Sequence, residues 1–399
     1  MKICAVICEY NPFHSGHLYQ LSKVPAGFDR IICVMSGNFV QRAEPAVADK
    51  YMRAETALSC GADMVVENPI LYATANGEKF AEGALKVISS LPDVSGLIMS
   101  CECDDPSLIN AVAEAQATES ESFRKNMKDY LGRGLSYATA YCSATADELS
   151  GKFEKSKIKD ALSKPNNLLC VEYVKSIIRR NLNIKPIIIK RKGNDYNDNR
   201  PYGDFLSASA IRNILQSDCP SSAMPYLPEY DKLFEFIKNG KTADLSLYEA
   251  ISLNNIRLSS PETLGKAFDC REGLEFALFQ NARSCQSLTE ALEKTKSKRY
   301  TYARLKRIVL QNNLGITKDV MEKVESEILP FHVLACKIDF KNYFSQIEKN
   351  AVIRNSDYDK FSSFDYLFEI ERKAAALYST ITHSPDNYMN EKLLSDKPV

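Results

Sequence analysis

Five short apolar runs in the first half of the chain constrain its fold more than any other feature of the sequence. They are rich in isoleucine and valine, and they lie at residues 2–9, 30–36, 63–67, 96–100 and 185–191. Continuous runs of this kind are typical of strands that are buried on both faces. Helical spacing lies between them, as in Phe80, Ala84, Val87, Ile88 and Leu91. The alternation predicts an α/β fold, with a parallel sheet covered by helices.

The pattern changes near Asp218. The stretch "SDCPSSAMPYLPEY", residues 217–230, carries three prolines and several serines and is typical of a linker. Beyond it, the apolar residues follow a helical period. We therefore predict an α/β domain over residues 1–217, with a helical insertion at about 104–164, and a mainly α-helical domain over residues 218–399.

The composition narrows the class of protein. The chain has 399 residues, 45% of them hydrophobic, and a formal net charge of zero, so any nucleic-acid surface must be a local patch. No apolar run approaches the ~20 residues of a membrane span, and the N-terminus lacks a signal-peptide pattern. Twelve cysteines without a C-x-x-C pair favour buried thiols in a reducing cytoplasm over a metal site. We expect a cytoplasmic protein that binds neither a membrane nor a structural metal.

The most informative motif is "HSGH", which runs from His14 to His17 directly after the first apolar run. Gly16 allows the close approach of a backbone or ligand, and a helix N-terminus there would offer unpaired N–H groups to phosphate. Two imidazoles can also donate hydrogen bonds to oxygens whose charge grows as pyrophosphate leaves, which suits nucleotidyl transfer. A capping or packing pair is an alternative interpretation, and a zinc site is a weaker one.

A second motif, "FLSASAIRNIL", lies near the end of the α/β half. Ser207 or Ser209 can cap a helix that carries Arg212. Serine hydroxyls, the main-chain amides at a helix start and a guanidinium group together can form a second anion-binding site. Such a helix start is common by itself, and it becomes specific when it is paired with the histidine motif.

These residues carry a family resemblance. The chain resembles the tRNA(Met) cytidine acetate ligases, within the H-x-G-H nucleotidyltransferase superfamily. The matching runs include "EYNPFHSGHLYQL", "VMSGNFVQRAEPAVADKYMRAETAL", "GADMVVENPILYAT", "LSKPNNLLCVEYV" and "SASAIR", with weaker similarity at "KRYTYARLKRIVLQNNLGIT". The resemblance covers most of the chain, and it implies a Rossmann-like nucleotidyltransferase domain.

The resemblance also implies a reaction in two steps. The family forms acetyl-adenylate and pyrophosphate from acetate and ATP, with which Mg²⁺ is expected. It then passes the acetyl group to the exocyclic amine of the wobble cytidine of elongator tRNA(Met). His14 and His17 would be the catalytic residues. The residues expected to bind ATP are Ile7, Cys8, Glu9, Tyr10, Asn11, Pro12, Phe13, His14, Ser15, Gly16, His17, Leu18, Tyr19, Gln20, Ser100, Asn166, Arg191, Ser207, Ser209 and Arg212.

The sequence departs from the family pattern at several positions. Ser100 replaces a glycine that approaches the nucleotide, Ala43 replaces the glycine after Q-R, and the family's Y-H-D reads Y-N-D at residues 196–198. We interpret the chain as a divergent member that keeps the catalytic core.

Two polar segments are candidates for contacts with the other substrates. The residues that follow the second strand could line a site for acetate or cytidine, or form a solvated face; they are Asn38, Gln41, Arg42, Asp49, Lys50 and Arg53. Farther along, Arg299, Arg304 and Arg307 lie among tyrosines, which suits tRNA phosphates and stacked bases. A charged amphipathic helix is the alternative for that segment.

We therefore predict a cytoplasmic, ATP-dependent ligase that modifies tRNA. A small-molecule nucleotidyltransferase is one alternative, and a non-catalytic RNA-binding protein with a relic nucleotide fold is another. Stimulation of ATP–pyrophosphate exchange by acetate separates the ligase from both.

Overall fold

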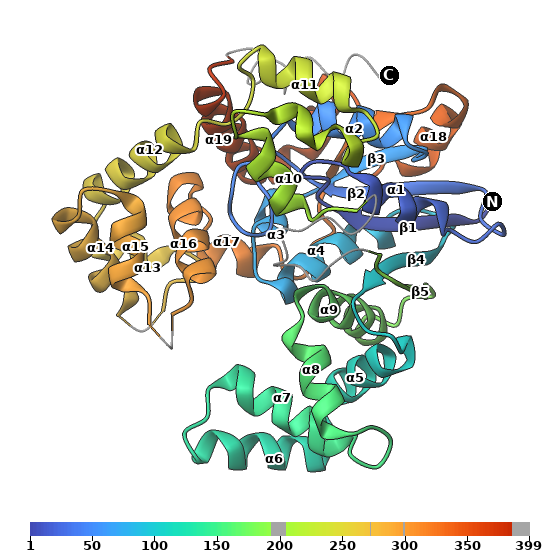
Figure 1. The fold of residues 1–399 in the computed structure, drawn as a ribbon, viewed down its shortest axis with the longest axis vertical. Coiled ribbons are helices and arrows are strands. Elements are labelled where there is room, and N and C mark those ends of the chain that lie inside the picture. The colour runs from blue at the N-terminus through green and yellow to red at the C-terminus, as the bar shows by residue number, and fades with distance from the viewer. Residues whose placement is uncertain (193–204, 272, 298–299, 385–399) are drawn as a thin grey trace.

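The computed structural model describes residues 1–192, 205–271, 273–297 and 300–384. At its centre lies a seven-stranded sheet in the order β5-β4-β1-β2-β3-β6-β7 (Figure 1). The strands are β1 (Ile3–Cys8), β2 (Arg30–Ser36), β3 (Met64–Asn68), β4 (Val94–Cys101), β5 (Lys185–Lys190), β6 (Phe331–Cys336) and β7 (Ala351–Val352). The first five coincide with the five apolar runs to within about two residues, so the predicted α/β fold is confirmed.

The order of the parallel strands identifies where a ligand site is expected. β1 pairs in parallel with both β2 and β4, β3 pairs with β2, and β5 pairs with β4. The chain thus builds outward from β1 to β3 and then returns to the other side of β1 as β4. Open parallel sheets bind ligands beyond the carboxyl ends of their strands, at the point where the strand order reverses. The segment that follows Cys8 leaves the sheet at that point.

Helices cover both faces of the sheet and build the rest of the chain. Those up to residue 215 are α1 (Ser15–Ser22), α2 (Lys50–Ser59), α3 (Ile70–Ala73), α4 (Gly77–Ser89), α5 (Pro106–Thr118), α6 (Glu121–Gly132), α7 (Tyr137–Glu148), α8 (Lys155–Ser163), α9 (Pro165–Arg179) and α10 (Ala208–Leu215). The later α-helices are α11 (Tyr230–Lys238), α12 (Leu245–Leu258), α13 (Pro261–Lys266), α14 (Leu274–Ser284), α15 (Leu288–Thr295), α16 (Tyr302–Leu314), α17 (Lys318–Lys323), α18 (Phe344–Ile347) and α19 (Asp365–Ile381). The described residues also form the 3-10 helices η1 (Pro220–Tyr226), η2 (Ile338–Tyr343) and η3 (Asn355–Phe364).

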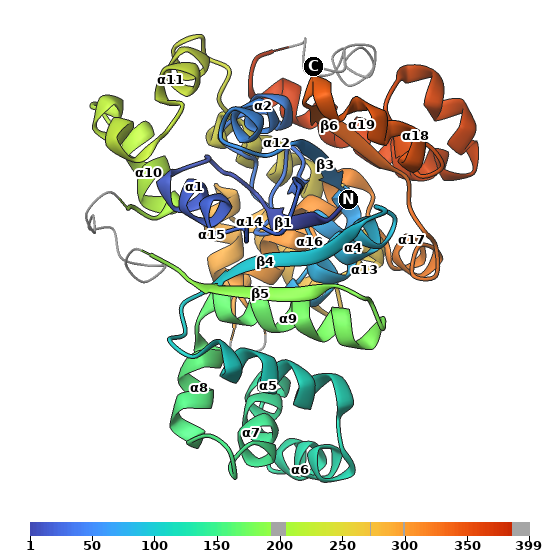
Figure 2. The same ribbon diagram turned by 90° about the vertical axis from the view of Figure 1, so that its right-hand side faces the viewer.

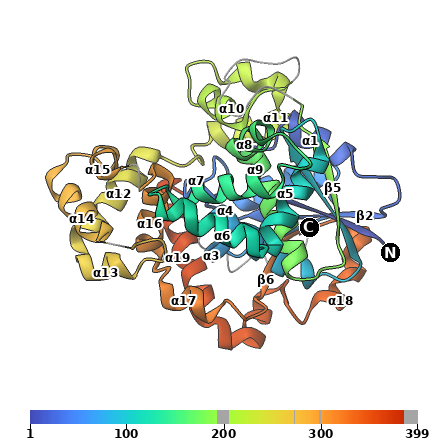
Figure 3. The same ribbon diagram turned by 90° about the horizontal axis from the view of Figure 1, so that it is seen from below.

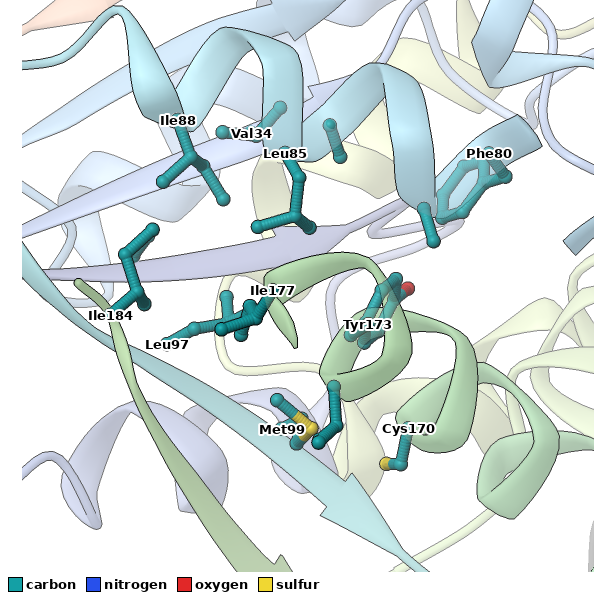
Figure 4. Packing of buried hydrophobic residues seen from close by; sticks show 14 of the residues in the cluster. Val34, Phe80, Leu85, Ile88, Leu97, Met99, Cys170, Tyr173, Ile177 and Ile184 are labelled. Atoms are coloured by element: carbon teal, nitrogen blue, oxygen red, sulfur yellow. The ribbon is translucent and has the colours of Figure 1, made fainter. Parts of the chain in front are cut away.

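The main core lies between the sheet and helices α4 and α9 (Figure 4). Phe80 and Leu85 of α4 and Ile177 of α9 meet Leu97 and Met99 of β4, and all five side chains are buried. Burying one such side chain contributes about 1.5–3 kcal/mol. Helices α4 and α9 thus cover one face of the sheet, while α1 and α2 pack on the opposite face.

Helices α5 to α8 form the segment expected as a helical insertion. They lie between β4 and α9 in the chain, and α6 and α7 lie farthest from the sheet (Figure 2). The domain limits at residues 104–164 and at residue 217 remain predictions.

The part of the chain beyond residue 217 is mainly helical, but it does not stay apart from the sheet. Helices α12 to α16 form a lobe with its own hydrophobic cluster beside the α/β body (Figures 1 and 3). β6 then returns to the sheet and pairs antiparallel with β3. The prediction lacked this strand, because its short apolar run stands among helical patterns and its partner is remote in sequence.

The segment at residues 217–230 is not the linker that its prolines and serines suggest. Residues 220–226 form η1, and Ala223, Leu227 and Tyr230 are buried in a cluster with Val47 and Ala48. Proline is compatible with the first turn of a helix, and the apolar residues between the prolines provide a face that packs on the body.

Candidate functional site

A sharp turn at the end of β1 begins the site. Tyr10 adopts the left-handed region, with φ of 47°, which a non-glycine residue seldom occupies. Its hydroxyl lies 3.4 Å from the sulfur of Cys33 on β2. The Oδ1 atom of Asn11 then accepts a hydrogen bond from Val47 N at 2.8 Å. These contacts tie the turn to the neighbouring strand and loop, so the chain enters α1 in a defined direction.

The two histidines of the motif cap α1 together. His14 is the N-cap residue, and its Nδ1 accepts a hydrogen bond from Gly16 N at 3.0 Å. The Nδ1 of His17 accepts one from His14 N at 3.2 Å. Because each Nδ1 is an acceptor, each neutral ring carries its proton on Nε2. The two rings stack with their centroids 3.7 Å apart, so two N–H donors lie side by side.

Gly16 is required by the ring of His14. A Cβ atom at this position would lie 2.8 Å from Cε1 and 3.0 Å from Nδ1 of that ring. Both distances are shorter than ordinary contacts, so a side chain here would displace the imidazole. The group that closely approaches Gly16 is therefore the His14 ring of the protein itself.

The surroundings keep both imidazoles neutral. Burial, together with the smaller effect of the Arg191 and Arg212 guanidinium groups, lowers the pKa of His14 to about 3. Burial also holds the pKa of His17 well below its ordinary value, with His14 and Arg191 adding to the shift. The positive charge beside the pair therefore resides on the two arginines, and the histidines contribute hydrogen-bond donors. Such a combination suits a polyanion.

A cavity of about 400 Å³ contains this pair, and we call it the first cavity. Thirteen of the residues expected to bind ATP line it, and these are Ile7, Cys8, Glu9, Tyr10, Asn11, His14, Gly16, His17, Gln20, Ser100, Asn166, Arg191 and Arg212. The turn, β4 and the segments after β5 thus converge on one space. The role of each residue in binding ATP remains a prediction.

Other residues of the motif lie outside the first cavity. Phe13 is buried in the core between the sheet and α2, and Pro12 lines a small separate gap near it. The Ser15 hydroxyl donates to Tyr226 O at 3.1 Å. Leu18 is exposed, and the ring of Tyr19 packs edge-on against Phe205. These side chains hold α1 in place.

The second motif reaches the first through its arginine. Nη1 of Arg212 on α10 donates to the main-chain oxygen of Asn11 at 2.7 Å. Ser207 caps α10 by accepting from Ala210 N at 3.2 Å, and Ser209 lies 3.2 Å from it, hydroxyl to hydroxyl. Neither serine lines the first cavity, so the guanidinium is the part of this motif that the structure brings to the histidines.

The remaining predicted positions lie at the ends of β4 and β5. Ser100 is on β4, and the Arg191 main-chain N–H donates to Cys101 O at 2.8 Å. The Nδ2 atom of Asn166, at the start of α9, donates to the Glu102 carboxylate at 2.6 Å. This network places Arg191 and Asn166 on the side of the cavity that faces the histidine turn.

Several residues that line the first cavity were not predicted from the sequence, among them Glu44, Gly77 and Tyr173. Another feature that was missed is the state of Glu9. Burial raises the pKa of this carboxyl, against the effect of the Gln41 N–H, which donates to Oε1 at 2.6 Å. The signal for Glu44 was its place after β2, next to the candidates Gln41 and Arg42, because that loop lies at the same edge of the sheet.

The polar cluster after β2 is not a solvated face throughout. Arg53 is 1% exposed, and its guanidinium donates to the main-chain oxygens of Glu9, at 2.5 Å, and of Gly37. Lys50 is also buried and forms an ion pair with Glu67 at 2.8 Å. Both therefore stabilise the loops around the site, and within this segment Gln41 and Arg42 are exposed to the first cavity.

The candidate tRNA contacts have partners within the helical lobe. Arg299 lies outside the described residues. Nε of Arg304 donates to Asp269 O at 2.9 Å, and Nε of Arg307 forms an ion pair with the Asp269 carboxylate at 2.8 Å. Their contact with tRNA remains a prediction.

The residues that the structure describes contain no group of three or more histidine, cysteine, aspartate or glutamate side chains arranged to hold a metal ion. None of their helices has both the length and the apolar character of a membrane span.

The chain is similar over its length to proteins of known activity. Residues 1–392 match the HIGH Nucleotidyl Transferase family. The tRNA(Met) cytidine acetate ligase of Clostridium perfringens is 35% identical over 96% of both chains, and that of Caldicellulosiruptor saccharolyticus is 36% identical over 95% of this chain and 94% of its own.

Solved structures agree with this similarity. Apo Thermotoga maritima TmcAL is 31% identical and superposes with a TM-score of 0.91, over 97% of this chain and 96% of its own. TmcAL bound with alpha-thio ATP is 30% identical, with a TM-score of 0.89 over the same shares.

Proposed function

The chain belongs to the tRNA(Met) cytidine acetate ligase family of HIGH nucleotidyl transferases, and we propose on this premise that it acetylates tRNA with ATP and acetate. The observation that carries the proposal is the stacked pair of neutral histidines beside two arginines, at the switch point of the sheet. A site with hydrogen-bond donors and fixed positive charge suits the departure of pyrophosphate.

The first step joins acetate to the α-phosphorus of ATP. A carboxylate oxygen of acetate attacks this atom, the bond to the bridging oxygen of pyrophosphate breaks, and acetyl-adenylate remains. Negative charge develops on the phosphate oxygens as the bond breaks. The Nε2–H groups of His14 and His17 donate to these oxygens, while Arg191 and Arg212 balance the charge. A donor of this kind is worth about 10²–10³ in rate.

The second step moves the acetyl group to the wobble cytidine of elongator tRNA(Met). The exocyclic amine attacks the carbonyl carbon, the bond from that carbon to the adenylate oxygen breaks, and AMP leaves with the oxygen. One proton leaves the amine as N4-acetylcytidine forms. AMP is a good leaving group because its phosphate oxygens share the negative charge that the departing oxygen receives when the carbon–oxygen bond breaks.

Mg²⁺ is expected to arrive with ATP. The described residues form no acidic cluster that would hold the ion by itself, and Mg²⁺ characteristically keeps water ligands and binds substrate phosphates. The ion would shield the phosphate charges during attack. On this proposal the chain supplies the histidine donors and the two guanidinium groups.

The lobe of α12 to α16 is the part of the chain that we infer holds tRNA. Arg299, Arg304 and Arg307 are the proposed phosphate contacts. Arg304 is held through Nε, and its terminal nitrogens remain the atoms for a phosphate. Changing all three to alanine should weaken tRNA binding and make it less dependent on salt, since each lost contact lowers the log–log slope by somewhat under one unit.

The experiment that tests the proposed function is nucleoside mass spectrometry of tRNA incubated with the protein, ATP and isotopically labelled acetate. We expect labelled N4-acetylcytidine that appears only when both ATP and acetate are present. Unmodified tRNA from active, folded protein would refute the proposal. Pyrophosphate exchange that proceeds equally without acetate would favour a small-molecule nucleotidyltransferase.

A further inference from the structure

A second cavity, of about 470 Å³, lies between the α/β body and the helical lobe. Its size falls within the ~300–1,000 Å³ of small-molecule sites. One side is formed by the loop after β2 and by α10, and the other by α12, α15 and the start of α16. It is therefore built by both parts of the protein.

The two cavities meet. Arg42, Glu44 and Arg212 line both of them. Lys306 of α16 forms an ion pair with Glu44 at 2.6 Å, which ties the lobe to the loop at this junction. A group bound in the second cavity would consequently lie beside the contents of the first, with Arg212 between them.

The lining of the second cavity has the chemistry of a nucleotide site. Tyr302 provides a half-buried aromatic ring, and Lys306 lies 5.1 Å from its centroid. A base can stack on such a ring while a nearby cation meets its phosphate. Asn213 on α10 and Gln216, which follows the end of that helix, add amide donors, and these match the two ring-side acceptors of cytosine, N3 and O2.

We propose that the second cavity receives the acceptor cytidine, turned out of its single-stranded loop, and that Tyr302, Asn213 and Gln216 bind its base. The proposal rests on the proposed function and specifies where its second substrate binds. Enzymes that modify a base commonly take it out of its stack into such a pocket. Held there by its ring-side acceptors, the base directs its exocyclic amine toward the junction, where the adenylate carbonyl carbon would lie.

Other occupants fit the second cavity less well. Acetate is far smaller than the space, and its carboxylate must reach the α-phosphorus in the first cavity. The triphosphate of ATP requires the paired histidine donors, which line only the first cavity. A pyrimidine nucleotide accounts for the aromatic ring, the amides and the cations together.

The test compares two measurements on each variant: acetate-dependent pyrophosphate exchange, and acetyl transfer at tRNA concentrations far below saturation. Tyr302→Ala should lower kcat/KM for tRNA by about tenfold or more, the scale of one lost base–aromatic stack. Exchange should continue at the wild-type rate, because the first cavity is intact. Tyr302→Phe should keep most of the transfer activity.

Phe279→Ala is the matched control for Tyr302→Ala. Phe279 packs partly buried on the same hydrophobic cluster of the lobe as Tyr302, but it lines neither cavity. It should leave transfer unchanged. An equal loss of transfer in both alanine variants would mean that the effect comes from lobe packing, and would overturn the role of Tyr302.

A second pair of variants tests the proposal without removing a packed side chain. One variant fills the second cavity, and the other is its control outside the cavity. Asn213 is exposed and lines the second cavity, so Asn213→Trp should abolish transfer and spare exchange. Asp218→Trp, at an exposed position just beyond α10, should affect neither. Normal transfer by Asn213→Trp would overturn the proposal. A wild-type protein that shows no acetate-dependent exchange would instead refute the proposed function itself.

Discussion

Two buried histidine sites lie on one sheet, at β1 and at β6, with β2 and β3 between them, and their surroundings carry opposite charge. His14 and His17 follow β1 and face Arg191 and Arg212, which together with burial keep both rings neutral. His332 lies on β6, where burial opposes a charge but the carboxylates of Glu371 and Glu67 raise the pKa of the ring.

The two sites also differ in what their nitrogen atoms contact. His332 Nδ1 lies 3.0 Å from the Glu67 carboxylate, and its Nε2 lies 2.9 Å from the Tyr358 hydroxyl. Both nitrogens therefore have protein partners, and the ring lines neither cavity. In the first site the backbone donates to Nδ1 of each ring, and no hydrogen bond joins either Nε2 to a residue that the structure describes, which leaves these atoms for the proposed ligand. Burial alone does not distinguish a functional histidine from a structural one. The charge of the neighbouring side chains distinguishes them, and so does whether the second ring nitrogen has a partner within the protein.

The largest effect should come from the structural site. His332→Ala removes one partner of a buried charge network that holds β6 beside β3, so it should lower the free energy of unfolding by about 3–5 kcal/mol. Urea denaturation measures this loss. Glu67 keeps Lys50 at 2.8 Å, which places the expected value near the lower end. A loss below about 1 kcal/mol would mean that the network does not secure β6.

The next largest effect should be on catalysis at the first site. His14→Ala and His17→Ala should each lower acetate-dependent pyrophosphate exchange by about 10²-fold or more, which corresponds to about 2.7 kcal/mol. ATP affinity should change less than rate, because the donors act on charge that develops during the reaction. Exchange near the wild-type rate in both variants would favour the capping interpretation of the motif.

The pH dependence of stability should separate the two sites further. The unfolded chain binds a proton at His14 below pH 6.5, while the folded ligand-free protein does so only near pH 3. The free energy of unfolding therefore decreases as the pH is lowered from 6.5 to 3. At pH 5 the loss attributable to His14 is about 2 kcal/mol. His14→Asn lacks this loss. Denaturation experiments should therefore show its free energy of unfolding rising by about this amount relative to that of the wild type when the pH is lowered from 7 to 5.

His332 should behave in the opposite sense, because its pKa is raised in the folded state. Its contribution is fully present below pH 6.5 and is lost as the pH rises through the folded value. The destabilisation caused by His332→Ala should thus be greatest in acid. Parallel pH profiles for His14→Asn and His332→Ala would contradict the assignment of opposite charge states.

The smallest effect concerns Ser100 on β4, which lines the first cavity where the family has glycine. Ser100→Gly should leave ATP affinity within about tenfold of the wild type, or improve it, because removing the side chain relieves crowding of the nucleotide. Isothermal titration with ATP measures this change. A larger loss of affinity would show that the serine hydroxyl contacts the nucleotide.

The same contrast explains what the sequence allowed us to predict. The first five strands were recognisable because each is a local, continuous apolar run, and the histidine motif because its parts lie within four residues and act on one another's backbone. Both signals are local. The helix start at the histidine motif and the close approach at Gly16 follow from them, whereas the switch-point position depends on the strand order that the structure provides.

The structural site could not be predicted in this way. Glu67 and His332 are 265 positions apart, and Lys50, which pairs with Glu67, looks solvent-exposed by residue type alone. Their burial depends on an antiparallel strand that joins the sheet from the far end of the chain. The second cavity was missed for the same reason, because it exists only where the lobe meets the body.

The formation of acetyl-adenylate beside His14 and His17 is the central step of the proposed reaction. The most direct test supplies acetate with heavy oxygen in its carboxylate, together with ATP and tRNA, and weighs the AMP released. If the acetate oxygen attacks the α-phosphorus and the carbonyl carbon is later taken by the amine, one heavy oxygen remains on AMP. We predict labelled AMP in equal amount to the acetylcytidine formed. Acetylated tRNA accompanied by unlabelled AMP, or by ADP, would contradict the account.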